Sequence, residues 1–255
     1  MDRNCLVIRA GRLPYRPAWE WQQKLAEDIG KGIIPPVLLI VEHPHTFTLG
    51  RSGKEEHLLW GEEERSRRGV ETFWVDRGGD ITYHGPGQIV GYPLFPLSSG
   101  GIAAGDGALP RLDVVGYIRR LEEALIRALR YFGAAGQRRA GMSGVWVEWN
   151  NPPDRLPTFR KVASIGVKVD ARGVSLHGFA LNHSTEREYW SGIIACGLEG
   201  VEMTSLADLL QPLPAMSDVE ESIIREMGEV FGLTMRKIEG IQPFDTIPKS
   251  LYTIS

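Results

Sequence analysis

The chain has 255 residues, of which 42% are hydrophobic and 24% charged, a composition typical of a globular protein with a sizeable core. Its formal net charge of −3 lacks the basic excess of a nucleic-acid-binding protein, and its two cysteines are too few for a disulfide framework. No apolar run reaches the roughly 18 residues of a membrane span, and the N-terminal apolar run is too short for a signal peptide. We therefore expect a cytoplasmic protein with no nucleic-acid or membrane partner.

The first part of the chain predicts several strands and one helix. Residues 17–29 carry apolar side chains at spacings of three and four, which indicates an amphipathic helix. Residues 37–41 form a continuous apolar run, which is typical of a buried central strand. Further strands are predicted at residues 6–10, 47–49, 72–75 and 89–94.

The second part of the chain predicts two more helices and a set of strands. Asp113 is a predicted N-cap for a helix over residues 114–132. Ser217 and Glu220 are predicted to form a capping box for a helix that reaches about residue 231. Strands are predicted at residues 145–148, 162–169 and 174–181, and loops at residues 98–110 and 149–160. Because no repeat or linker divides the chain, we predict one α/β (α+β) domain over residues 1–255, a mixed β-sheet flanked by helices.

Residues 77–92, RGGDITYHGPGQIVGY, form the segment with the strongest functional signal. Its four glycines and one proline within eleven positions exclude a helix interior. Glycine pairs let a backbone approach a ligand closely, Arg77 offers a fork of hydrogen-bond donors, and His84 can exchange protons near neutral pH. We interpret the segment as ligand-binding, with a tight hairpin carrying incidental polar residues as the alternative.

The two cysteines and one lysine differ in their sequence context. Cys5 begins an apolar strand and is predicted to be a small core residue. Cys196 follows a polar stretch and precedes Gly197, which favours a turn at a surface or cleft, where a thiol near a cation is a good nucleophile. Lys161 opens an apolar strand and is expected to be solvated at the strand entrance, with a cleft-facing lysine that acts on a thiol as the alternative.

Several other site types find no support. Residues 85–87 do not match the glycine spacing of a dinucleotide-binding fingerprint, and the chain has no phosphate-binding loop of the GxxxxGK[ST] form. Residues 141–144 resemble a serine nucleophile elbow, but Val145 occupies the position of its last glycine. The histidines lack the spacing of zinc ligands, so we expect no metal and no cofactor.

At the level of whole segments, the chain resembles the lipoyl(octanoyl) transferases. RGGDITYHGPGQIVGYPL closely resembles the signature of that family, and KVASIGVKV, SLHGFALN and ACGLEGVEMTSL fall in the family's order. EHPHTFTLG, which precedes the signature, is similar to the family's early strand-and-turn segment. Together they extend over most of the chain from about residue 37 to 210. The resemblance implies the fold shared with biotin and lipoate protein ligases, a mixed β-sheet with helices packed around it.

The resemblance also implies which residues form the site. The family's nucleophile falls on Cys196 and its lysine on Lys161. Its substrate-binding residues fall on Arg77, Gly78, Gly79, Asp80, Ile81, Thr82, Tyr83 and His84; on Ser164, Ile165 and Gly166; and on Gly178, Phe179 and Ala180. His84 and His177 are second candidates, for proton transfer or for shaping the site.

The implied reaction is transfer of an octanoyl group from octanoyl-acyl carrier protein to a lysine. The acceptors are the lipoyl domains of 2-oxoacid dehydrogenases or the glycine-cleavage carrier protein. The acyl group passes through a thioester on Cys196, and backbone amides near residues 78–79 or near Cys196 are candidates to stabilise the oxyanion.

Three alternatives to this reaction remain open. The first is an ATP-dependent lipoate or biotin ligase on the same fold, and the second is a non-catalytic module that binds an acyl group or a carrier protein. The third is a cysteine hydrolase that uses Cys196 and His177. The chain departs from the family in longer segments at residues 98–110 and 149–159, and in Ala195, where many members have proline.

Overall fold

The computed structural model describes residues 4–97, 113–149, 158–197 and 200–238. Nine strands form the larger sheet: β1 (Asn4–Arg12), β2 (Val37–Glu42), β6 (Gln88–Leu94), β7 (Gly136–Arg139), β8 (Met142–Trp149), β9 (Thr158–Val169), β10 (Ser175–Asn182), β11 (Glu202–Met203) and β12 (Thr234–Ile238). Their order is β12-β1-β2-β6-β10-β9-β8-β7, and β11 pairs with β9. Strand β1 is parallel to both of its neighbours, β12 and β2. Each pair of neighbouring strands from β2 through β6, β10, β9 and β8 to β7 is antiparallel, so the sheet is mixed as predicted.

A smaller sheet and several helices complete the described structure. The smaller sheet has the order β4-β3-β5 and consists of β3 (Thr46–Leu49), β4 (Glu71–Trp74) and β5 (Ile81–His84). The α-helices are α1 (Tyr15–Gly30), α2 (Glu62–Arg67), α3 (Val114–Tyr131), α4 (Leu206–Leu209) and α5 (Met216–Phe231). Three short 3-10 turns are η1 (Glu55–His57), η2 (Arg187–Gly192) and η3 (Ala195–Gly197). Within the described residues, no helix combines the length and apolar character needed to cross a membrane.

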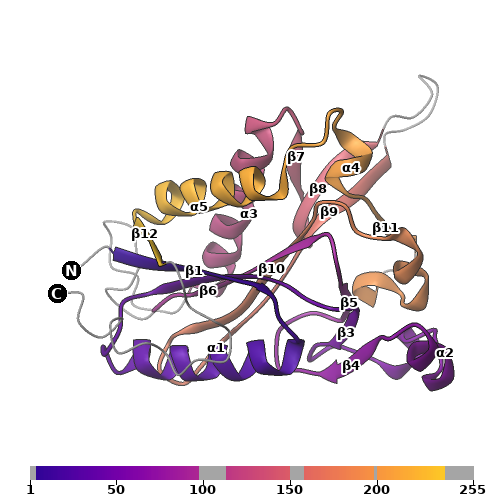
Figure 1. The fold of residues 1–255 in the computed structure, drawn as a ribbon, viewed down its shortest axis with the longest axis horizontal. Coiled ribbons are helices and arrows are strands. Elements are labelled where there is room, and N and C mark those ends of the chain that lie inside the picture. The colour runs from indigo at the N-terminus through magenta and orange to yellow at the C-terminus, as the bar shows by residue number, and fades with distance from the viewer. Residues whose placement is uncertain (1–3, 98–112, 150–157, 198–199, 239–255) are drawn as a thin grey trace.

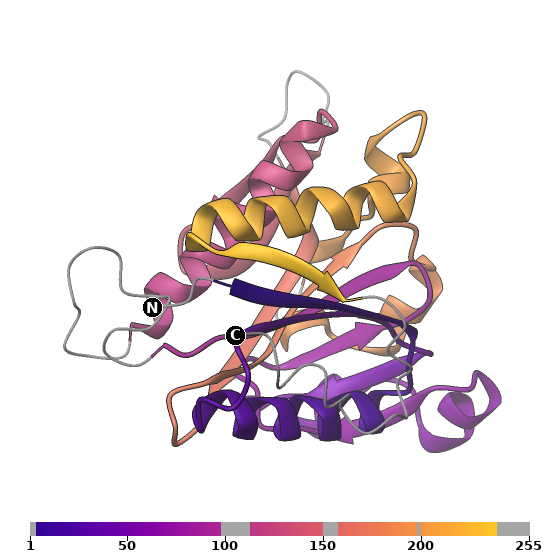
Figure 2. The ribbon, with the colours of Figure 1, turned by 60° about the vertical axis from the view of Figure 1, so that its left-hand side comes forward.

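The helices cover both faces of the larger sheet (Figure 1). α3 and α5 lie side by side over one face, which Figure 2 shows from a second direction, and bury a core that includes Leu121, Leu125 and Ile223. α1 covers the opposite face, where Leu25 joins a second core. The central strands are therefore buried on both faces, which explains why their sequences are apolar runs.

The glycine-rich segment connects the two sheets. β5 pairs with β3 in the smaller sheet, whereas β6 pairs with β2 and β10 in the larger one. The hairpin alternative for residues 77–92 is therefore wrong, because β5 and β6 belong to different sheets. The connection places residues 77–80 against β9, where the amide of Gly78 donates to the carbonyl oxygen of Val167 at 2.9 Å.

Two details of the predicted elements need correction, while one cap is confirmed. The Asp113 side chain accepts a hydrogen bond from the amide of Gly116 and caps α3 as expected. The capping box at Ser217 is wrong, because Met216 packs against the core and α5 begins there, with Ala215 as an N-cap that has no side-chain bond. A capping box occurs instead at Ser205, before α4.

The two predicted loops fall mainly outside the described residues. Residues 98–110 lie outside them entirely, as do residues 150–157. The remainder of the second loop is strand, because β8 continues to Trp149 and β9 begins at Thr158.

Candidate active site

A cavity of about 280 Å³ forms where residues 77–84, β9, β10 and η3 meet. Its lining includes Cys196, Lys161, His177 and, with one exception, all members of the three segments expected to bind substrate. The exception is Tyr83, which lies in the core of the smaller sheet and bonds through its hydroxyl to Nδ1 of His45 at 2.9 Å.

Lys161 and Cys196 are in direct contact inside this cavity. The Lys161 Nζ donates to the Cys196 Sγ over 3.1 Å. Lys161 is only 3% exposed, and its Nζ lies 4.7 Å from the centre of the Trp146 ring. The expectation of a solvated lysine is therefore wrong. Among the described residues no carboxylate forms an ion pair with Lys161, so the sulfur is its polar partner.

A β-bulge in β9 brings Lys161 to the face of the strand that lines the cavity. Lys161 lies opposite Trp146 and Ala163 lies opposite Val145, so Val162 is an extra residue without a partner on β8. In a regular strand residues 161 and 164 would point to opposite faces. The bulge shifts this alternation, and Lys161 lines the same cavity as Ser164.

The backbone that carries Cys196 has an unusual conformation. Cys196 and His177 are the two non-glycine residues of the described structure in the left-handed region, with φ of 60° and 59°. Both line the cavity. This conformation costs about 1–2 kcal/mol for a residue with a side chain, and such strain is concentrated at functional sites.

Gly197 allows this turn to pack closely against a partly buried acid–histidine pair. His57 Nδ1 donates to both carboxylate oxygens of Asp80 at 2.9 Å, and the amide of Ile81 donates to the same carboxylate. A Cβ atom on Gly197 would collide with the Asp80 carboxylate, so a larger residue does not fit there. The amide of Ile194 donates to the His57 carbonyl oxygen at 2.9 Å, which fixes the other end of the turn.

Arg77 places a buried guanidinium beside the thiol. Its Nη2 donates to the carbonyl oxygen of Thr48 at 2.6 Å and its Nη1 to that of Gly78 at 3.1 Å. Burial lowers the pKa of Arg77, yet an arginine stays charged in proteins. Gly166 leaves room for this side chain, because an added Cβ would lie 3.0 Å from the Arg77 Cδ.

His177 belongs to an ion-pair network that sequence reasoning missed. Its Nε2 donates to Asp76 at 2.9 Å, and Lys168 pairs with the other oxygen of the same carboxylate. The hydrogen bond from His177 holds the pKa of Asp76 well below its usual range, while burial lowers the pKa of His177. The only available signal for Asp76 is its position directly before Arg77.

His84 is buried within a cluster of rings. Its Nδ1 bonds to Oε1 of Gln88 at 2.9 Å, and its ring stacks on Tyr15 with the centres 5.8 Å apart. Burial lowers the pKa of His84 well below its ordinary value, as it lowers that of the neighbouring His43 to about 4. Neutral, fully bonded rings of this kind favour the site-shaping alternative for His84 over proton transfer.

Some polar atoms at the cavity have no protein partner. Within the described residues, these buried atoms are Oγ1 of Thr82, Oγ of Ser164 and Nδ1 of His177. Buried polar atoms are costly when unpaired, so a bound substrate or water is their expected partner.

Two of the candidate oxyanion amides are already used within the protein. The amide of Gly78 donates to Val167, and that of Gly197 donates to the carbonyl oxygen of Ile194 at 2.9 Å. The amides of Gly79 and Cys196 remain as the candidates from these two segments.

Long-range packing adds residues that carried no signal in the sequence. Tyr15 from α1 and Tyr92 from β6 also line the cavity. Met142 and Ser143, which matched only an incomplete serine motif, line it from β8. No group of three or more metal-ligating side chains is close enough to hold an ion in the part of the chain that the structure describes.

Known proteins similar in sequence cover nearly the whole chain. A family model described as the lipoyl protein ligase A/B catalytic domain matches residues 14–228. An octanoyltransferase of Chloroflexus aurantiacus is 41% identical over 234 residues, which cover 92% of this chain and 97% of the relative. An octanoyltransferase of Acidobacterium capsulatum is 40% identical over 245 residues, with coverage of 95% and 96%.

Solved structures resemble the fold at much lower sequence identity. A bipartite lipoate protein ligase, described with its E2 lipoyl domain from Thermoplasma acidophilum, matches with a TM-score of 0.65 and 17% identity, covering 99% of this chain and 91% of the other. Lipoate-protein ligase A bound with ATP matches with a TM-score of 0.65 and 15% identity, covering 99% and 93%. These matches confirm the predicted ligase-like fold.

Proposed function

The chain belongs to the octanoyltransferase family within the lipoyl protein ligase A/B catalytic domains, and from this premise we propose that it transfers octanoate through a thioester on Cys196. Membership makes it an acyltransferase. The observation that carries the proposed mechanism is the 3.1 Å contact between the Lys161 Nζ and the Cys196 Sγ. A cation held against a sulfur inside a substrate-sized cavity is the arrangement that an activated cysteine nucleophile needs.

In the first half-reaction the Cys196 thiolate attacks the carbonyl carbon of the octanoyl thioester. The new bond joins the acyl carbon to the Cys196 Sγ, and the bond to the carrier sulfur breaks. The departing carrier thiolate takes a proton from the Lys161 ammonium, which becomes a neutral amine. Exchange of one thioester for another is nearly balanced in energy, so this step needs no ATP.

In the second half-reaction the neutral acceptor amine attacks the Cys196 thioester. Lys161 takes the proton that the amine loses, and the Cys196 thiolate leaves as the amide forms. The ammonium and thiolate of the starting state are thereby restored. Because an amide is more stable than a thioester, the second step draws the whole reaction forward.

The acyl chain occupies the apolar side of the cavity in this proposal. Val90, Ile165 and Phe179 supply apolar lining beside the thiol. Six buried methylenes at about 0.8 kcal/mol each contribute roughly 5 kcal/mol of binding. The depth of this lining therefore sets the preferred chain length.

We place the reaction in the cytoplasm, with octanoyl-acyl carrier protein as donor. The acceptors are lipoyl domains of 2-oxoacid dehydrogenases or the glycine-cleavage carrier protein. The names of the octanoyltransferase relatives support the acyl group, and the archaeal ligase described with an E2 lipoyl domain supports the class of acceptor.

The contact between Lys161 and Cys196 also supports the transferase over the three alternatives. An ATP-dependent ligase activates its acid as an adenylate and needs no cysteine nucleophile. A non-catalytic module needs neither a buried lysine nor a strained cysteine, because both cost stability. In a hydrolase the base would contact the thiol, but the polar partner of the Cys196 Sγ is the Lys161 Nζ rather than His177.

The test is the intact mass of the protein after incubation with octanoyl-acyl carrier protein and no ATP. We expect an added octanoyl mass that maps to Cys196 and disappears when a lipoyl domain is added. Modification of the lipoyl domain only with ATP and free octanoate would establish the ligase alternative instead.

A further inference from the structure

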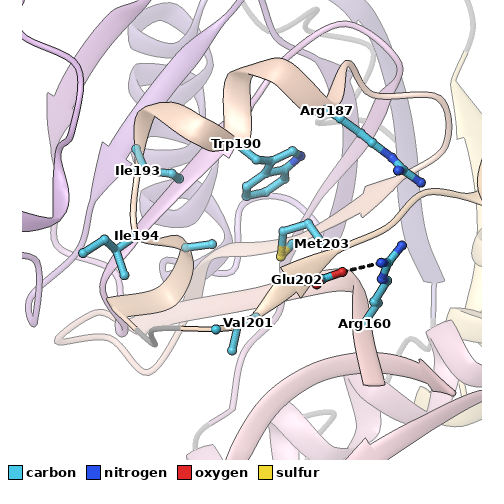
Figure 3. A pocket seen from close by; sticks show the side chains of 10 residues that line it. Arg160, Arg187, Trp190, Ile193, Ile194, Val201, Glu202 and Met203 are labelled. Carbon is cyan, nitrogen blue, oxygen red and sulfur yellow. Dashed lines mark ion pairs between the residues drawn. The ribbon is translucent and has the colours of Figure 1, made fainter. Parts of the chain in front are cut away.

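A second cavity lies next to the Cys196 turn and takes no part in the chemistry described above. It has a volume of about 450 Å³. Figure 3 shows Trp190 and Met203 at its centre, with Arg160 and Arg187 on the same side of it. Its size falls in the range of small-molecule sites, and it combines an apolar floor with two cations and one carboxylate, that of Glu202, which pairs with Arg160.

The Cys196 turn and β9 separate this cavity from the first one, which contains the Cys196 thiol and is proposed to hold the acyl chain. Ala195 lines the second cavity, whereas the next residue, Cys196, lines the first. Likewise Arg160 lines the second cavity and its neighbour Lys161 the first, because adjacent residues of a strand point to opposite faces. A substrate that reaches the sulfur from this side would thus extend away from the acyl chain.

We propose that this cavity binds the phosphopantetheine arm of the acyl donor, with Arg187 and Arg160 contacting its phosphate. The inference rests on the proposed function, which requires a carrier-bound thioester. Such an arm is a slender chain with amide and dimethyl groups that ends in a thiol at one end and a phosphodiester at the other. The apolar floor suits the chain, and guanidinium groups are the preferred protein partners of phosphate.

Charge distinguishes the donor arm from the acceptor as the occupant. The acceptor is a lysine side chain, which arrives as an ammonium and would be repelled by Arg160 and Arg187, since the Glu202 carboxylate of this cavity is already paired with Arg160. The donor arm carries a negative charge at its far end and gains from the same two groups. Complementary charge thus assigns this side of the turn to the donor.

Neighbouring residues hold the two arginines in place without using all of their donors. Arg187 pairs with Asp208 over 2.6 Å and its side chain is 60% exposed, so the guanidinium is accessible to a phosphate. Arg160 pairs with Glu202 and lies over the Trp149 ring, with its Cζ 3.8 Å from the ring centre. Both guanidinium groups are therefore oriented before a phosphate binds.

Two synthetic thioesters that differ only in the phosphate test the proposal. Octanoyl-phosphopantetheine and octanoyl-pantetheine are compared as acyl donors by the kcat/KM of acyl-enzyme formation. We expect the wild-type protein to prefer the phosphorylated donor, and Arg187→Gln to lower the ratio of the two kcat/KM values about tenfold. The control Arg127→Gln, on the exposed surface of α3, should keep the wild-type ratio.

The possible failures of this experiment are distinct. If the wild-type protein shows no preference, or Arg187→Gln combined with Arg160→Gln keeps the wild-type ratio, the proposed arm site is wrong. If those variants acylate normally but transfer octanoate slowly to a lipoyl domain, the cavity serves the acceptor and the assignment to the donor is overturned. If neither thioester acylates the wild-type protein, the proposed function itself fails.

Discussion

The protein has two thiols whose surroundings are opposite in kind. Cys5 is fully buried in β1 among apolar side chains, where burial strongly raises the pKa of its thiol. Cys196 lies on a left-handed turn at the wall of a cavity, and the Lys161 Nζ is 3.1 Å from its sulfur. The same functional group is thus a small core residue in one place and a candidate nucleophile in the other.

The comparison shows which features of its surroundings make a thiol reactive. Burial alone, as at Cys5, keeps a thiol neutral and inert. At Cys196 a buried cation, an accessible cavity and a turn that presents the sulfur are combined. Each of the following substitutions removes one feature that distinguishes Cys196 from Cys5, or tests whether burial keeps a titratable group neutral.

The largest effect is expected from removal of the reactive thiol. Cys196→Ala should lower the rate of octanoyl transfer by at least about a thousandfold, because no thioester can form. The measurement is transfer of octanoate from its carrier to a lipoyl domain, followed by mass spectrometry. Transfer at near the wild-type rate would show that the acyl group never resides on this cysteine.

The matched control is the other thiol. Cys5→Ala should keep transfer within about twofold of wild type and reduce the free energy of unfolding by about 1–2 kcal/mol, because it leaves a small void in the core. A large loss of activity in this variant, with stability retained, would contradict the assignment of Cys5 to a purely structural role.

Loss of the cation should have the next largest effect. Lys161→Met keeps the length of the side chain but removes its charge, so acyl-enzyme formation should slow by about a hundredfold. Alkylation of Cys196 by iodoacetamide should slow as well, since the sulfur would lose the cation that contacts it. Lys237→Met, at an exposed ion pair far from the cavity, serves as the control. An unchanged alkylation rate in Lys161→Met would show that Lys161 is not what makes Cys196 more reactive than Cys5.

A smaller effect is expected on the pH dependence of stability, which tests whether burial keeps the histidine side chains neutral. Burial lowers the pKa of His43 to about 4 from 6.5, so the unfolded chain binds a proton at this site at a higher pH than the folded one. Stability should therefore fall as pH drops from about 6.5 towards 4. Between pH 7 and pH 5 the contribution of His43 is on the order of 2 kcal/mol. His84 and His177, whose pKa values are also lowered by burial, act in the same direction.

Urea denaturation at these two pH values measures the effect. His43→Gln should lose less stability between pH 7 and pH 5 than the wild-type protein does. The lowered pKa of Asp76 does not interfere, because its contribution is lost only below the ordinary pKa of about 3.8. An equal loss in both proteins would show that His43 does not hold its neutral form through burial.

The elements of the sheet could be predicted because their signals are local. Apolar runs such as residues 37–41 and the apolar spacing in residues 114–132 each identify an element without reference to the rest of the fold. The start of α5 could not be predicted, because packing of Met216 outweighed the capping signal at Ser217. Pairing of β5 and β6 with different sheets depends on distant strands and left no local trace.

The sequence identified the segments that form the candidate site, but not the orientations and contacts of their side chains. The resemblance placed Arg77 and Cys196, and the structure brings their segments to one cavity. The solvated Lys161 expected from its place at a strand entrance was wrong, and the cleft-facing alternative depends on a bulge at Val162 that the sequence does not signal. Tyr15 and Asp76 reach the site only through packing that no spacing in the sequence encodes.

The left-handed backbone at Cys196 lowers the stability of the fold, although the reaction needs a cysteine at this position. Glycine adopts this conformation without strain, so Cys196→Gly should raise the free energy of unfolding by about 1 kcal/mol while it abolishes transfer. Selection for stability alone would replace this cysteine, and only selection for chemistry retains it. A descendant of this protein released from its reaction would thus lose the thiol early and keep the cavity, becoming a more stable binding protein built on the same sheet.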